Sequence, residues 1–146
     1  MPTKSTRRKN HKLTVQYVTA RRGVPSAGSL RAWAALVPME ATLRIVGVAE
    51  GRKLNLRYRG RPYATNVLSF PYENGRGDIV LCHPVIAREA RAQGKSLAAH
   101  YAHLLLHGLL HLRGYRHEKK REALRMAREE IRLLARAGFG NPYTVE

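Results

Sequence analysis

The sequence contains little that could cross-link the chain or anchor it in a membrane. Its 146 residues include one cysteine, Cys82, so no intramolecular disulfide can form and a reducing compartment is expected. The longest apolar stretch, around residues 104–112, is interrupted by histidines and is too short to span a bilayer. Residues 1–12 are polar and basic, and the apolar core of a signal peptide does not follow them. We therefore expect a cytoplasmic protein that is not attached to a membrane.

Acidic residues are also scarce. Ten Asp and Glu stand against 27 Lys and Arg, which gives a formal net charge of +17. A compact domain with this excess repels itself unless it meets a polyanion, so nucleic acid or an anionic membrane is the partner that composition predicts. The hydrophobic fraction of 44% is that of a folded globular protein, and the length suits one domain with its own core. We expect a disordered basic arm at residues 1–12 and one domain at residues 13–146.

The order of the predicted elements favours an α+β fold. We expect four strands, at residues 13–18, 42–48, 64–72 and 78–83, with a turn-rich segment between the last two. We expect five helices, at residues 25–36, 49–58, 84–92, 96–113 and 118–137. Strands come early and helices late, without a repeat or a linker. The chain is therefore predicted to form a single domain in which a small mixed sheet packs against the helices.

The segment from residue 107 to residue 117 carries the strongest functional signal. It contains His107, His111 and His117, with Gly114 between the last two. Residues four apart share one face of a helix, so His107 and His111 can reach the same divalent ion. A glycine one turn later is typical of a left-handed C-terminal cap, which would reverse the chain and bring His117 back as a third ligand.

Three imidazole ligands leave one tetrahedral position open for water, as in catalytic zinc sites. The alternative is a set of unrelated histidines on an ordinary helix. The leucines around them argue against it, because a leucine-rich helix should be largely buried and a buried imidazole cluster is costly without a bound partner. We therefore predict one Zn²⁺ per chain, in a site carried by a helix in the C-terminal half.

The same spacing occurs in the metzincin proteases, whose pattern is H-E-x-x-H-x-x-G-x-x-H. Their catalytic glutamate follows the first histidine, and in this chain that position is Gly108. A glycine cannot act as a general base. A metalloprotease therefore stays open only as a weak alternative.

Three blocks of residues follow one another in a characteristic order. The first contains Leu54-Asn55, Tyr58-Arg59-Gly60 and Thr65-Asn66-Val67-Leu68-Ser69-Phe70-Pro71. The second is Gly77-Asp78-Ile79-Val80-Leu81-Cys82, and the third runs from His103 to His117. With these blocks the chain, over about residues 40–146, resembles the YbeY family of metal-dependent endoribonucleases, whose third block reads H-G-x-L-H-L-x-G-Y-D-H.

The resemblance implies an activity and a set of site residues. It implies a single-strand-specific, metal-dependent endoribonuclease of ribosomal RNA processing, acting in maturation of the small-subunit rRNA 3′ end and in ribosome quality control. Single-stranded RNA, ribosomal RNA, the ribosome and ribosomal proteins are the partners it implies. The metal ligands, counted among the catalytic residues, are His107, His111 and His117. Arg59 is the catalytic residue implied to engage the RNA.

Arg116 stands where the family pattern has an aspartate next to the last histidine. Such a carboxylate would orient the ligand, so its absence changes the surroundings of the ion. We predict that Arg116 faces the mouth of the cleft as a phosphate contact, and that Glu118 or a backbone carbonyl orients His117 instead. Asn66 and Ser69 are candidates for hydrogen bonds to phosphate or sugar. The alternative is that they form hydrogen bonds within the protein at the edge of a strand.

The residues leave two questions open. No carboxylate on the predicted helix is placed to act as a base, so the nucleophile is either water activated by the ion or the RNA 2′-hydroxyl. A non-catalytic RNA- or ribosome-binding assembly factor with a structural metal would fit the charge equally well. Turnover by metal-replete protein, lost on chelation, would separate the enzyme from the binding factor.

Overall fold

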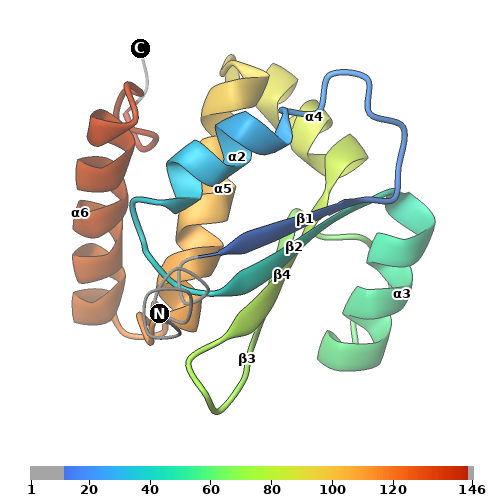
Figure 1. The fold of residues 1–146 in the computed structure, drawn as a ribbon, viewed down its shortest axis with the longest axis horizontal. Helices are drawn as coiled ribbons and strands as arrows, with labels where there is room; N and C mark the ends of the chain where they lie inside the picture. Colours follow the sequence, from blue (N-terminus) through green and yellow to red (C-terminus); the bar gives the residue numbers. More distant parts are fainter. Residues whose placement is uncertain (1–11, 145–146) are drawn as a thin grey trace, which may run out of the picture.

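The computed structural model describes residues 12–144 and contains a four-stranded sheet and five helices (Figure 1). The strands are β1 (Leu13–Tyr17), β2 (Ala41–Val46), β3 (Val67–Pro71) and β4 (Gly77–Cys82). The helices are α2 (Ala27–Ala34), α3 (Val48–Arg59), α4 (His83–Gln93), α5 (Leu97–Leu112) and α6 (Lys120–Arg136). Helix α6 packs against α5 rather than against the sheet. The predicted α+β domain with a small mixed sheet is confirmed. Residues 1–11 of the predicted arm lie outside the described residues.

The sheet is mixed because crossover connections join its parallel strands and a hairpin joins its antiparallel pair. The strand order is β1-β2-β4-β3, with β1, β2 and β4 parallel and β3 antiparallel to β4. Parallel neighbours need a crossover, and α2 supplies the one between β1 and β2. A hairpin joins β3 to β4, closed by the Tyr72 N–H, which donates to the Arg76 carbonyl at 2.8 Å. This topology leaves β3 as an edge strand, against which α5 packs.

Two strand boundaries differ from the sequence prediction by more than one residue. The strand expected from residue 64 begins at Val67, although the Asn66 carbonyl still accepts a bond from the Cys82 N–H at 3.0 Å. The strand expected to reach residue 48 ends at Val46, because Gly47 is already the N-cap of α3. Both differences fall at element ends, where the apolar pattern continues past the last ladder bond.

The two faces of the sheet pack against different helices. Toward α5 and α2 the strands present an apolar set with no exposed surface, which includes Leu43, Ile45, Ile79 and Leu81. The opposite face forms a smaller cluster of Val46, Leu68, Val80, Cys82 and Val85, against which Leu54 of α3 packs. The alternation along each strand thus divides the structure into a main core and a lesser one.

Helix α5 is the central element of the main core. Ser96 caps its first turn by accepting a hydrogen bond from the Ala99 N–H at 3.0 Å. Five leucines of α5 are buried, and each fully buried leucine contributes roughly 1.5–3 kcal/mol to stability. The helix can lie close to the sheet because glycines, Gly108 of α5 and Gly77 of β4, stand where the two elements meet. A methyl group on Gly108 would lie 3.1 Å from Ile79 Cδ1 and 3.2 Å from Ser69 Oγ.

Gly77 fixes the position of the last residue of α5. A Cβ atom there would lie 2.5–3.0 Å from three side-chain atoms of Leu112. Gly77→Ala is therefore expected to lower the free energy of unfolding by roughly 1–3 kcal/mol, the usual cost of overpacking. Urea unfolding measures this change.

Gly28→Ala in α2 is the matched control. The only atom within 4 Å of a Cβ there is Ser26 Oγ, at 3.8 Å, so this change should not lower stability. An unfolding midpoint of Gly77→Ala equal to that of the parent would mean that Leu112 moves aside without cost.

Candidate metal centre

The C-terminal end of α5 brings the three predicted histidines together. His107 and His111 lie one turn apart on the helix, which ends at Leu112. Gly114 adopts the left-handed conformation, with φ of +100°, and the Tyr115 N–H returns to the Leu110 carbonyl at 3.0 Å. The chain therefore reverses direction as the glycine predicts, and His117 comes back toward the helix.

The resulting cluster has the dimensions of a site for one ion. One ligand nitrogen from each histidine lies within 4.8 Å of the others. The ring centroids of His111 and His117 are 4.8 Å apart, and those of His107 and His111 are 5.0 Å apart. His107 and His111 are half-buried and His117 is exposed, so the cluster is open to solvent on one side. Three imidazoles with an open side suit a divalent ion such as Zn²⁺.

The electrostatics of His111 favour the form that can bind a metal. Burial lowers the pKa of His111 first, and the neighbouring His107, His117 and Arg116 lower it further, to about 4. A group with this pKa is neutral near pH 7 and offers a nitrogen lone pair. A protonated imidazole could not act as a ligand.

A buried carboxylate from another helix orients the first histidine. Glu130 of α6 is 1% exposed. Its Oε2 accepts from His107 Nδ1 at 2.5 Å, its Oε1 accepts from His103 Nε2 at 2.8 Å, and the Tyr143 hydroxyl donates to Oε1 as well. Because Nδ1 of His107 carries the donated hydrogen, its Nε2 is left as the nitrogen for a metal. This is the arrangement in which a carboxylate supports a metal-ligating histidine.

The charge state of Glu130 follows from these contacts. Burial alone would raise the pKa of Glu130, but the hydrogen bonds from His103, His107 and Tyr143 outweigh it and lower the pKa to about 2. Glu130 is therefore an ionised, acceptor-only group at neutral pH. Sequence reasoning missed Glu130, because it considered carboxylates on the histidine-bearing helix alone. The feature of the sequence that could have revealed Glu130 is its position on the buried stripe of α6, between Met126 and Leu133.

The residues around His117 differ in part from the prediction. Glu118 Oε2 accepts a hydrogen bond from the backbone N–H of His117 at 2.9 Å, so this carboxylate holds the main chain of the ligand. Arg116 is exposed, and its guanidinium donates to the Tyr115 carbonyl at 3.2 Å. Its charge is near enough to lower the pKa of His111. Its contact with phosphate stays a prediction.

The other predicted substrate residues lie elsewhere or already have protein partners. Arg59 is the exposed last residue of α3, and no hydrogen bond or ion pair within residues 12–144 joins it to the histidines. Asn66 donates to the Glu89 carboxylate at 3.0 and 3.3 Å. Ser69 Oγ lies 3.5 Å from the Gly108 carbonyl, a weak contact that links β3 to α5. Tyr58, the neighbour of Arg59, packs on Phe70 of β3, whereas Ser69 of the same strand contacts α5, so the end of α3 and the end of α5 lie on opposite faces of this strand.

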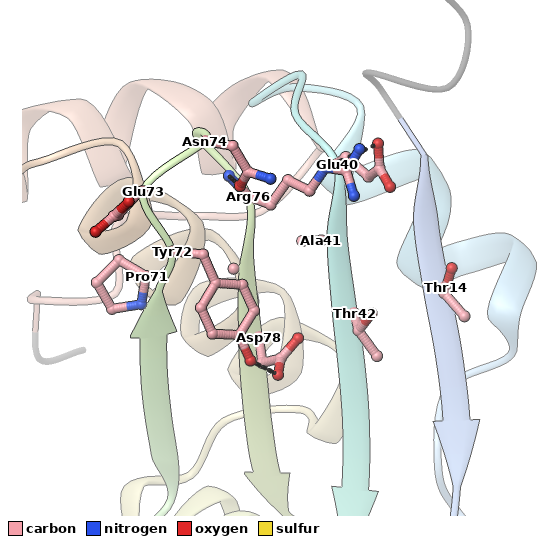
Figure 2. A pocket seen from close by; sticks show the side chains of 11 residues that line it. Thr14, Glu40, Ala41, Thr42, Pro71, Tyr72, Glu73, Asn74, Arg76 and Asp78 are labelled. Atoms are coloured by element: carbon pink, nitrogen blue, oxygen red, sulfur yellow. Dashed lines mark hydrogen bonds and ion pairs between the residues drawn. The ribbon is translucent and has the colours of Figure 1, made fainter. Parts of the chain in front are cut away.

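A hollow of about 650 Å³ lies on the sheet face that points away from α5, and Figure 2 shows the side chains that line it. Glu40, Glu73 and Asp78 line it, with Arg76 paired to Glu40 at 3.5 Å and the Tyr72 hydroxyl bonded to Asp78. These are three of the ten acidic residues of the chain. A hollow with this excess of carboxylates repels phosphate, so the histidine cluster is the better candidate site for a polyanion.

Comparison with known proteins identifies the family. The model of the family described as endoribonuclease YbeY matches residues 7–138. The chain belongs to the YbeY endoribonuclease family. No helix within residues 12–144 is long and apolar enough to cross a membrane.

Curated relatives are similar over most of their length. The endoribonuclease YbeY of Aromatoleum aromaticum is 52% identical, over 82% of this chain and 81% of the relative. That of Alkalilimnicola ehrlichii is 48% identical over 92% of each chain. The solution structure of TM1509 from Thermotoga maritima shares the fold, with a TM-score of 0.58 and 21% identity over 91% of this chain and 99% of that one. The resemblance seen in the three sequence blocks is thereby confirmed.

Replacing Glu130 with Gln is expected to weaken metal binding, because an amide removes the charge and can accept on one oxygen only. Loss of such an orienting partner typically costs 10- to 100-fold in affinity, and we expect a change of about this size. Competition between the protein and a chelator for Zn²⁺ measures it.

Glu129→Gln is the matched control. Glu129 is the neighbouring residue, and its carboxylate pairs with Arg132 at 2.7 Å on the outside of α6. Its Zn²⁺ affinity should equal that of the parent. Equal affinities for Glu130→Gln and the parent would show that Glu130 serves the fold alone.

Proposed function

We propose that this protein is a metal-dependent endoribonuclease that cleaves single-stranded RNA at the His107, His111 and His117 cluster. The observation that carries the proposal is the cluster itself, three imidazoles within 4.8 Å at the end of a buried helix and open to solvent on one side. Membership of the YbeY endoribonuclease family supports RNA as the substrate. Single-stranded RNA fits best, because a flexible backbone can reach an ion between half-buried ligands.

Each residue of the proposed site would have a separate role in binding the metal or the RNA. The three histidines would hold one divalent ion, for which Zn²⁺ suits the all-nitrogen donor set. When bound, such an ion activates water and polarises a phosphoryl oxygen. Glu130 keeps His107 in the tautomer that binds. Arg116, beside the cluster, and Arg59, across β3, would attract the phosphates on either side of the scissile bond and stabilise charge that develops there.

We further infer that the substrate is ribosomal RNA, including the 3′ end of small-subunit rRNA, with roles in ribosome quality control. The net charge of +17 supports a polyanionic partner such as ribosomal RNA, and the protein would meet the ribosome and its proteins through that RNA. The buried free thiol of Cys82 supports a reducing compartment, the cytoplasm. A non-catalytic binding factor with the same metal would bind the same RNA without turnover. A protease is disfavoured, because Gly108 faces the sheet where a protease has its base.

Removing the metal should remove the activity. His111→Ala is expected to lose bound Zn²⁺ and cleavage of a fragment that contains the small-subunit rRNA 3′ end, and chelation of the parent should do the same until Zn²⁺ is restored. His83→Ala, at the start of α4, is the control and should keep its metal. Metal analysis and gel-based cleavage measure both. A His111→Ala protein with one Zn²⁺ per chain would rule the site out.

Arg59 should affect turnover more than metal binding. Arg59→Ala is expected to lower the cleavage rate at least tenfold with Zn²⁺ content unchanged, since the guanidinium is proposed to contact phosphate. Arg59→Lys should restore only part of the rate, because an ammonium lacks the bidentate fork. Arg57→Ala is the control from the same turn, where Arg57 lies over the ring of Tyr58 at 5.4 Å. Full activity of Arg59→Ala would make Arg59 an ordinary surface cation.

A further inference from the structure

A large groove adjoins the metal centre and is not used by the proposed chemistry. Its volume is about 1110 Å³, above the roughly 300–1,000 Å³ of most small-ligand sites. The end of α4, the first turns of α5 and the segment 139–144 form its walls. We call it the α4–α5 groove, and the lining residues that matter here are Asn66, Glu89, Lys95, His100, His103 and Tyr143.

The histidines that line the groove lie on the same face of α5 as the metal ligand His107. His100, His103 and His107 follow one another along one face of α5, with ring centroids 6.5 and 6.4 Å apart. His103 lines the groove and shares the Glu130 carboxylate with His107. An RNA strand held at the cluster by one phosphate therefore has this groove open beside it, one helical turn away.

Tyr143 presents an aromatic ring at this point. Its side chain is 53% exposed, although its hydroxyl is bonded to the buried Glu130. The ring stands edge-on to His103, with centroids 5.4 Å apart and an interplanar angle of 87°. Lys95 Nζ holds the same segment by donating to the Pro142 carbonyl at 2.8 Å. A ring fixed at its hydroxyl and exposed on a face is suited to stacking on a nucleobase.

Glu89 presents a hydrogen-bond acceptor in the same groove. Its carboxylate accepts from His100 Nε2 at 2.9 Å and from Asn66 Nδ2 at 3.0 and 3.3 Å. A carboxylate has about four acceptor positions, so roughly one remains. His100 is 4% exposed, and its Nδ1 has no partner among the described residues. The Glu89 carboxylate repels phosphate and suits the amino group of a base.

We propose that the α4–α5 groove binds the bases of the nucleotides flanking the scissile phosphate. One base stacks on Tyr143, and Glu89 accepts a hydrogen bond from an exocyclic amino group. Adenine, cytosine and guanine carry such a group, whereas the one N–H on the pairing edge of uracil, at N3, lies between two carbonyl oxygens that the carboxylate repels, so the groove disfavours uracil. This inference rests on the proposed function, since it places single-stranded RNA at the metal centre.

The stacking contact is tested with single-stranded RNAs that carry the fluorescent base 2-aminopurine at successive positions. Binding is measured in chelator, so that the RNA stays intact, and KM for cleavage is measured with Zn²⁺. Tyr143→Phe keeps the ring and loses the bond to Glu130, and Tyr143→Leu keeps bulk without a ring. Tyr72→Ala is the matched control, because Tyr72 is 52% exposed and is also bonded to a carboxylate, on the other face of the sheet (Figure 2).

We expect fluorescence quenching at one position with the parent, Tyr143→Phe and Tyr72→Ala. Tyr143→Leu should lose the quenching and bind about tenfold more weakly. If Tyr143→Phe loses as much as Tyr143→Leu, the hydroxyl and not the ring matters, and stacking is overturned. Circular dichroism checks that the variants are folded. A parent that cleaves no RNA refutes the proposed function, whereas cleavage with a KM indifferent to Tyr143→Leu refutes the groove alone.

Base preference tests the acceptor. The parent should bind RNAs with adenine, cytosine or guanine in the groove about tenfold more tightly than RNAs with uracil at the same position. Glu89→Gln should reduce this difference, because the amide can donate to a uracil carbonyl. Equal affinity of the parent for all four bases, or a preference unchanged in Glu89→Gln, would overturn the role of Glu89.

Discussion

The candidate metal centre depends on one buried carboxylate. Glu130 is removed from water, which is costly for an ionised group, and hydrogen bonds from His103, His107 and Tyr143 offset that cost. These bonds join α6, α5 and the C-terminal segment, three parts of the chain. The same bonds decide which nitrogen of His107 faces the ion. The same hydrogen bonds therefore stabilise the fold and hold His107 in the orientation suited to metal binding.

The position of the cluster relative to the sheet depends on close packing. Gly108 and Gly77 let the end of α5 approach β3 and β4 where any larger residue would touch Ile79 or Leu112. A ligand carried by a buried helix is held more precisely than one carried by a loop. Two of the three histidines have that support. The third, His117, depends on the turn at Gly114 and is the exposed member of the set.

The sequence predicted the parts of the site that are local. A spacing of four residues and a glycine after the helix end suffice to bring three histidines together, since both act within about three turns. Glu130 could not be found this way, because it reaches His107 from another helix and only its place on an apolar stripe marks it. The same holds for Asn66, whose partner Glu89 lies on α4. Arg59 is known from family resemblance, and its distance from the cluster depends on how α3 packs.

The replacement of the family aspartate by Arg116 is tolerable for a physical reason. Glu130 already supplies a carboxylate to the cluster, and Glu118 holds the main chain of His117, so the ligands do not depend on residue 116 for their orientation. Arg116 is exposed, and its repulsion of a bound cation is therefore screened by water and salt. Its predicted attraction for phosphate, by contrast, would act on the open side of the cluster, where RNA is proposed to bind. A cation at the open side and carboxylates in the buried layer give the centre two different electrostatic surroundings, one for the ligands and one for the substrate.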